Sequence, residues 1–203
     1  MKPILLIAFL ILFTNARPEY SSLTKSERVF AVNYLNESAL DLEKAVKGLT
    51  KSQLQFKAGP ERWSIAQCLE HIALSETGIF TRIEGLQKQA ADPSRRAEIK
   101  FTDEALIKAM LDRSQKGTAP ETLQPSGKFQ TPEVALKTFS DQRQKTTDWI
   151  GNTNEDLRDH VMPHPFFGML DSYQWVLLIA AHSKRHTLQI EEVKANVNFP
   201  KDI

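Results

Sequence analysis

The strongest constraint on the fold is a helical spacing of apolar residues that recurs in four long segments. In the first segment the apolar side consists of Val32, Leu35, Ala39, Leu42, Val46 and Leu49. Steps that alternate between three and four residues place such side chains on one face of an α-helix. The other segments cover about 64–91, 131–151 and 171–196, and no part of the chain has a convincing strand pattern. The sequence therefore predicts an all-α fold, a four-helix bundle.

Capping residues indicate where these helices begin. Three of them open on residue pairs with the spacing of a capping box, namely Thr24 with Glu27, Ser64 with Gln67, and Asp171 with Gln174. The remaining helix opens on Thr131, followed by Pro132 at its first position. Residues 51–56 are expected to form a short helical turn, and 102–111 a short helix. The segment 92–131 is too long for a tight turn, so it predicts a crossover between the second and third helices.

The first sixteen residues have the layout of a secretory signal peptide. Lys2 is followed by the unbroken apolar run Ile4–Phe13, and Ala16 is a small residue at a plausible cleavage position. Ten apolar residues are too few for a spanning helix, which needs about 20. We therefore expect residues 1–16 to be a signal peptide, residues 17–203 to be one domain, and the mature protein to be exported without stable insertion in a membrane.

Charge and cysteine content exclude two classes of protein. Cleavage after Ala16 would remove one basic residue, Lys2, from the 26 basic and 25 acidic residues, which leaves a formal net charge of zero. A nucleic-acid-binding surface needs clustered excess Lys and Arg, so we expect no nucleic-acid partner. Cys68 is the single cysteine, so the fold cannot depend on a disulfide framework.

Three histidines fall on predicted inward faces of the helices. His182 and His186 lie one turn apart on the apolar side of the last helix, and His71 lies on the inward side of the second. A shared metal ion would satisfy imidazoles that are costly to bury without partners. Three protein ligands with one open position are typical of a catalytic zinc-type site rather than a structural one. The alternative is that each histidine is an ordinary core residue with one hydrogen bond.

Small polar residues near these positions are candidates for a pocket or for support of the ligands. Cys68 and Ser75 flank His71, and Gln189 follows His186 by one turn. The predicted set beside the ligands is Cys68, Ser75, Gln142, Thr146, His164 and Gln189. Cys68 could be a fourth ligand, but a small buried apolar role fits free cysteine better. We expect His160 to lie at the surface.

Two motifs resemble those of the DinB-like superfamily of four-helix bundles. The segment Trp63–His71 resembles its second-helix signature, and the pair His182 and His186, after 164–168 and Gln174-Trp175, resembles its last-helix signature. The resemblance covers essentially the whole mature chain. It implies a fold similar to the bacillithiol and mycothiol transferases, with His71, His182 and His186 as ligands of one divalent ion, zinc or nickel.

The resemblance leaves the reaction open. We expect a metal-dependent enzyme that acts on a small molecule of unknown identity, either a hydrolase or a thiol S-transferase, and thiol transfer fits the family better. Export argues against transfer of thiols that are kept inside the cell and fits hydrolysis better. The alternative class is a non-catalytic bundle that binds a metal or a small ligand. A homodimer is compatible with either class.

Overall fold

The computed structural model describes residues 23–114 and 117–201. The predicted signal peptide, residues 1–16, lies outside them. The helices are α1 Lys25–Val46, α2 Lys51–Gln55, α3 Ile65–Gln87, α4 Asp103–Leu111, α5 Pro132–Asn152 and α6 Ser172–Lys194, with 3-10 turns η1 Pro93–Glu98 and η2 Glu121–Leu123. Among these described helices, none combines the length and the apolar character that crossing a bilayer requires.

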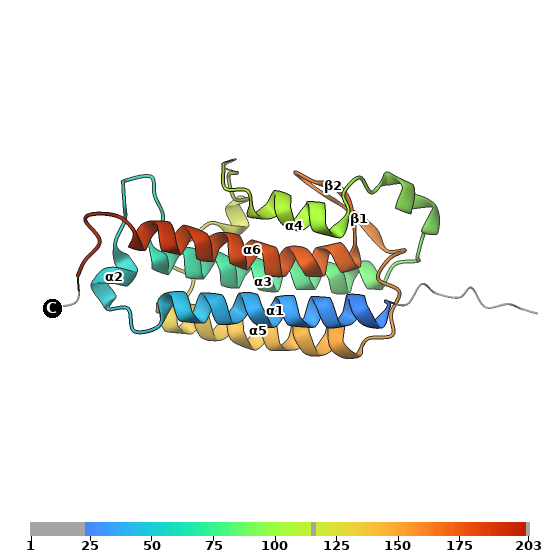
Figure 1. Cartoon of the computed structure of the whole chain (residues 1–203), viewed down its shortest axis with the longest axis horizontal. Coiled ribbons are helices and arrows are strands. Elements are labelled where there is room, and N and C mark those ends of the chain that lie inside the picture. The colour runs from blue at the N-terminus through green and yellow to red at the C-terminus, as the bar shows by residue number, and fades with distance from the viewer. Residues whose placement is uncertain (1–22, 115–116, 202–203) are drawn as a thin grey trace, which may run out of the picture.

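The long helices α1, α3, α5 and α6 form the predicted four-helix bundle (Figure 1). Each of α1 and α3 packs against both α5 and α6, so α5 and α6 lie diagonally opposite each other. At one end of the bundle, the Arg28 guanidinium of α1 donates to the Ile150 carbonyl of α5, and the Tyr173 hydroxyl of α6 donates to the Glu27 carbonyl. Therefore α1 runs antiparallel to α5 and parallel to α6.

The predicted crossover between the second and third long helices is confirmed, and the helix directions explain it. Because α3 and α5 are neighbours that run in the same direction, the chain must return the full length of the bundle between them (Figure 1). This return contains η1, α4 and η2. Helix α4 packs on the outer side of α6, so the first ten residues of α6 are buried around the whole helix rather than along one stripe.

A two-stranded hairpin lies between α5 and α6, in a chain for which no strand was expected. Strand β1 (Val161–His164) pairs antiparallel with β2 (Gly168–Asp171), and Gly168 supplies the positive φ of +72° that follows the turn. The expectation of no strand was wrong because four-residue strands are too short to show a clear alternation. The predicted end of α3 near residue 91 was also too late, since the helix ends at Gln87.

The capping predictions hold at three of the four long helices. Thr24 and Ser64 form complete capping boxes, and Thr131 caps α5 before Pro132. At α6 the Asp171 carboxylate accepts from the Gln174 amide, but the Gln174 side chain donates instead to the carbonyl of Phe101. The reciprocal half of that predicted box is therefore absent, because Gln174 ties α6 to the segment that leads into α4.

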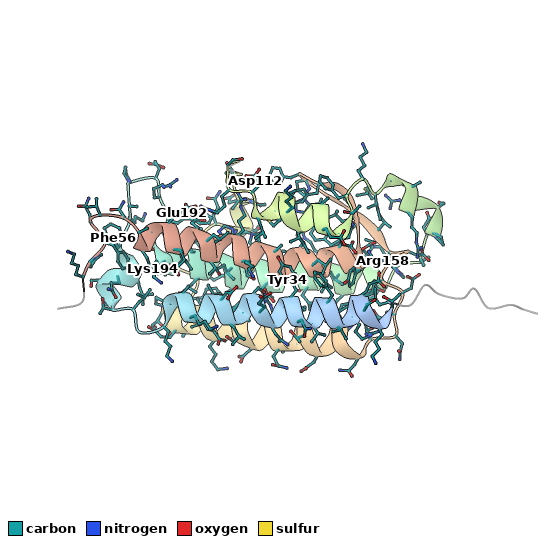
Figure 2. All side chains as sticks on the ribbon, viewed as in Figure 1. Tyr34, Phe56, Asp112, Arg158, Glu192 and Lys194 are labelled. Carbon is teal, nitrogen blue, oxygen red and sulfur yellow. The ribbon has the colours of Figure 1, made fainter. Side chains whose placement is uncertain are left out.

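An arginine joins the starts of three helices at one end of the bundle. Arg158, labelled in Figure 2, follows α5 and forms ion pairs with Glu27 of α1, Asp103 of α4 and Asp171, the N-cap of α6. Its guanidinium also lies 4.2 Å from the ring centroid of Tyr173. One side chain thus positions α4 and α6 relative to α1.

A buried polar layer divides the core into two apolar clusters. The first cluster includes Leu35, Phe80, Ile150 and Ala181, and the second includes Leu42, Ala73, Phe139 and Ile190. Between them Arg143 of α5 makes two hydrogen bonds with the Glu76 carboxylate of α3, at 2.6 and 2.8 Å. Arg143 also donates to Ser38 of α1 and Ser183 of α6. All four long helices therefore meet in one hydrogen-bonded layer.

Candidate metal centre

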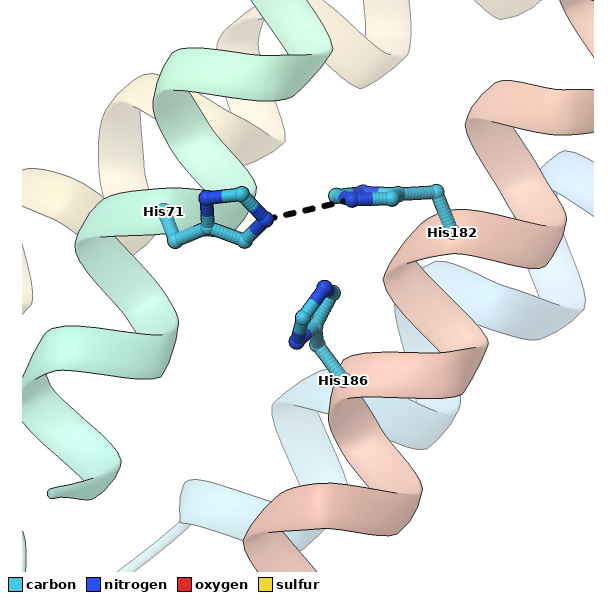
Figure 3. Close-up of side chains that lie close together, drawn as sticks. All are labelled: His71, His182 and His186. Atoms are coloured by element: carbon cyan, nitrogen blue, oxygen red, sulfur yellow. Dashed lines mark hydrogen bonds between the residues drawn. The ribbon is translucent and has the colours of Figure 1, made fainter. Parts of the chain in front are cut away.

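Three histidines from two helices converge between α3 and α6 (Figure 3). His71 extends from α3 toward His182 and His186 of α6, and one ring nitrogen of each lies within 4.8 Å of the others. The Nε2 atoms of His71 and His182 are 3.1 Å apart. His71 is buried, and His182 and His186 are at most partly exposed. The structure thus brings together the three residues that the sequence and the family resemblance indicated.

Two of the rings are oriented by hydrogen bonds at the nitrogen that faces away from the centre. His71 Nδ1 lies 2.7 Å from the carbonyl oxygen of Leu123, and His186 Nδ1 lies 2.9 Å from Gln189 Oε1. These oxygens accept, so both Nδ1 atoms carry the proton and both Nε2 atoms keep a lone pair. A metal-binding histidine usually has such a partner on its outer nitrogen, which fixes the ring and its tautomer.

The spacing and the protonation of the rings fit a bound divalent ion. Two nitrogens bound at about 2.0–2.1 Å to one ion lie about 2.9–3.4 Å apart at angles between square and tetrahedral, and the separation between His71 and His182 falls in this interval. Burial, together with the two neighbouring imidazoles, lowers the pKa of His182 well below its usual 6.5. Burial also lowers the pKa of His71, and lowers that of His186 to about 3. The rings are therefore neutral at pH 7, which is the state that binds metals.

Two parts of the surroundings were missed by the sequence reasoning. The indole of Trp63 lies against the rings of His71 and His186, with centroid distances of 4.9 and 6.1 Å. The carbonyl of Leu123 comes from η2 in the crossover. Trp63 stands directly before the N-cap of α3, a position that could have indicated it. A backbone carbonyl within a long connection has no sequence signal.

The other predicted site residues of α3 and α6 have different surroundings. Gln189 contacts His186 directly, as described above. Ser75 is buried one turn after His71, and its hydroxyl has no hydrogen-bond partner among the described residues. Cys68 packs in the second apolar cluster, where burial raises the pKa of its thiol to about 12. Cys68 therefore matches the apolar role that free cysteine favours.

Gln142 and Thr146 belong to a helix that carries none of the three histidines. Both are on α5, diagonally across the bundle from α6, and the Gln142 amide donates to the Thr146 hydroxyl at 3.4 Å. Within the described residues neither side chain hydrogen-bonds to a histidine of the centre. Their spacing along α5 predicted that both face the interior of the bundle. Spacing within one helix cannot show which of the other helices that face contacts.

The two remaining histidines also lie outside the trio. His164 of the hairpin stacks on Phe167 and packs against Trp175, and its Nδ1 accepts from the amides of Phe166 and Phe167. The expectation that His160 lies at the surface was wrong. His160 is buried, and its ring nitrogens lie within hydrogen-bond distance of the backbone carbonyls of Asp156, between α5 and β1, and Gln89, just after α3.

Comparisons with known proteins agree with this architecture. A solved structure of YfiT from Bacillus subtilis, described as a probable metal-dependent hydrolase with an unusual four-helix bundle topology, is similar with a TM-score of 0.59 and 19% identity, over 89% of this chain and 93% of that one. The uncharacterized protein YuaE of Bacillus subtilis strain 168 is 30% identical over 166 residues, which are 82% of this chain and 98% of that protein. The family model of the DinB superfamily matches residues 34–190. The resemblance inferred from the two histidine motifs is therefore confirmed: this chain belongs to the DinB superfamily.

Proposed function

We propose that this protein is a divalent-metal-dependent hydrolase whose ion is held by His71, His182 and His186. The observation that carries the proposal is the convergence of three neutral imidazoles, two of which have their outer nitrogen fixed by an acceptor. YfiT, which shares the fold, is described as a probable metal-dependent hydrolase. A zinc-type or nickel-type ion suits an all-imidazole ligand set.

A divalent ion in this position would supply Lewis acidity, which makes water nucleophilic near neutral pH and polarises a substrate carbonyl. The chain supplies three nitrogen ligands, so at least one coordination position stays free for a reactant. Trp63 lies against the rings of His71 and His186, on one side of the candidate centre.

Gln189 supports the centre through the ring of His186. Gln189→Leu removes the acceptor for His186 Nδ1 but none of the three ligands. We expect this variant to keep the ion at saturating metal and to lose about 10–100-fold in turnover, the usual cost of removing a partner of a ligand. Gln189→Glu keeps an acceptor at the same place and should lose less.

The measurement is turnover of esters and amides, and of thiol-acceptor compounds together with a low-molecular-weight thiol, by the wild type and both variants, each loaded with Zn²⁺ or Ni²⁺. Hydrolysis of an ester or amide supports the proposal. Turnover of thiol acceptors alone would assign the site to S-transfer. Bound metal without any turnover would favour the non-catalytic class, and equal turnover by Gln189→Leu and wild type would exclude a role for Gln189.

Export is a separate proposal, based on Lys2, the apolar run Ile4–Phe13 and Ala16. We expect the protein isolated from its source cells to begin near Arg17 and to be found outside the cytoplasm. Mass spectrometry of its N-terminal peptide, together with cell fractionation, measures both properties. A cytoplasmic protein that retains residues 1–16 would contradict export and would restore cytosolic thiols as candidate substrates.

A further inference from the structure

A buried carboxylate next to the metal centre holds the crossover against α3. Glu70 directly precedes His71 and is 7% exposed. Its two carboxylate oxygens accept hydrogen bonds from three consecutive backbone amides, those of Ser126 at 3.0 Å, Gly127 at 3.1 Å and Lys128 at 2.8 Å. Hydrogen bonds to an ionised acceptor are stronger than those between neutral groups. These three bonds therefore hold residues 126–128 of the crossover firmly against α3.

The backbone of the crossover is shaped for this carboxylate. Gly127 has a φ of +78°, which turns its amide and the two flanking amides toward one point. Such a concave set of N–H groups is an anion-binding arrangement in proteins. A Cβ at position 127 would meet no atom within 4 Å, so the glycine serves the backbone conformation rather than the packing.

The attachment lies close to the group that orients His71. Leu123, three residues before Ser126, accepts from His71 Nδ1 through its carbonyl. The Leu123 side chain also packs over Gly78, where an added Cβ would lie 3.8 Å from it. The same short stretch of crossover is therefore bound to two consecutive residues of α3, by its amides to Glu70 and by its carbonyl to His71.

We propose that Glu70 is a positioning residue for the metal centre. By holding residues 126–128 on α3, Glu70 keeps the Leu123 carbonyl opposite His71 Nδ1, and this contact keeps the proton on Nδ1 and the lone pair of Nε2 directed at the ion. The inference concerns the same three-histidine site as the proposed hydrolase and deepens it. It assigns a role in metal binding to a residue whose own atoms do not reach the ion.

A purely structural role would affect stability without affecting His71, and a matched pair of glycine variants separates the two possibilities. Gly127→Ala strains the crossover at the Glu70 contact. Gly48→Ala introduces the same strain between α1 and α2, because Gly48 has a φ of +76° and also no atom within 4 Å of an added Cβ. The two variants should lose similar stability, but only Gly127→Ala should weaken metal binding.

The affinity for Zn²⁺, measured by competition with a chelator, is the first readout. We expect Glu70→Ala to bind Zn²⁺ about 10–100-fold more weakly than the wild type, as for loss of other groups that orient a ligand. Glu70→Gln, which keeps one acceptor oxygen but turns an NH₂ group toward the amides, should lie in between. Unchanged affinity in Glu70→Ala and Gly127→Ala would overturn the proposal, as would an equal loss in Gly48→Ala.

The second readout is the tautomer of His71 in the metal-free protein, from the ¹⁵N shifts of its ring. The wild type should show a protonated Nδ1, and Glu70→Ala should populate the tautomer protonated at Nε2. A His71 tautomer that is the same in both proteins would overturn the proposal. If Glu70→Ala fails to fold, Gly127→Ala and Glu70→Gln provide the same comparison. A wild type that binds neither Zn²⁺ nor Ni²⁺ would refute the proposed function, while the tautomer of His71 would still decide the role of Glu70.

Discussion

Arg143→Met is expected to lower the free energy of unfolding by about 3–5 kcal/mol, the cost of leaving one partner of a buried ion pair without the other. The variant leaves Glu76 as an uncompensated carboxylate in the core, where the pair is 3% and 1% exposed. It also removes the donors to Ser38 and Ser183 and to the carbonyl of Leu35. Urea or thermal unfolding of the metal-free protein measures the loss.

Two comparisons test the cause of this loss. The ion pair between Lys137 and Asp141 is exposed, with side chains 75% and 57% exposed, so Lys137→Ala should cost well under about 1 kcal/mol. The double variant Arg143→Met with Glu76→Leu removes both charges and should recover much of the stability. A double variant as unstable as Arg143→Met would show that a change in packing volume, rather than an unpaired carboxylate at Glu76, lowers the free energy of unfolding.

His186→Ala is expected to abolish the stabilisation that a bound ion provides. An ion that binds only the folded state contributes about 2.7 kcal/mol at a hundredfold excess over its dissociation constant. The variant removes one of the three converging nitrogens, so the melting temperature in excess Zn²⁺ should fall toward that of the metal-free protein. The melting temperature without metal should change far less. Thermal unfolding with and without Zn²⁺ gives both values.

His164→Phe is the matched control for this prediction. His164 is also a partly buried histidine that packs on α6, through Trp175, but its ring nitrogens are not part of the converging set. The variant should bind Zn²⁺ as the wild type does. Equal destabilisation of His186→Ala with and without metal, or loss of metal in His164→Phe, would contradict the assignment of the ligands.

Much of the fold follows from local sequence signals. The apolar spacing predicted the four long helices. The N-caps predicted at Thr24, Ser64 and Thr131 are the residues at which α1, α3 and α5 begin in the structure. The crossover was predictable because a connection as long as 92–131 cannot be a tight turn. The hairpin around Gly168 was not predictable, because its four-residue strands are too short to show an alternating pattern.

Spacing along one helix predicted part of the candidate site, and His71 was added to it from its inward position on the second helix and from the family resemblance. The spacing of His182 and His186, and of Gln189 one turn later, places these side chains together whatever surrounds them. The polar layer around Arg143 was missed because its partners come from three other helices, and no single helix pattern shows them. For the same reason the spacing along α5 could not decide whether Gln142 and Thr146 lie near the histidines, since α5 packs against α3 and lies diagonally opposite α6.

The most direct test of the three-histidine centre is X-ray absorption spectroscopy of the wild type loaded with one equivalent of Zn²⁺. We predict a first shell that contains three imidazole nitrogens at about 2.0–2.1 Å and at least one exchangeable oxygen ligand. In His71→Ala the same measurement should show fewer imidazoles or no bound metal. A first shell with a sulfur ligand from Cys68, or one with fewer than three imidazoles in the wild type, would contradict the assignment of His71, His182 and His186 as the metal ligands.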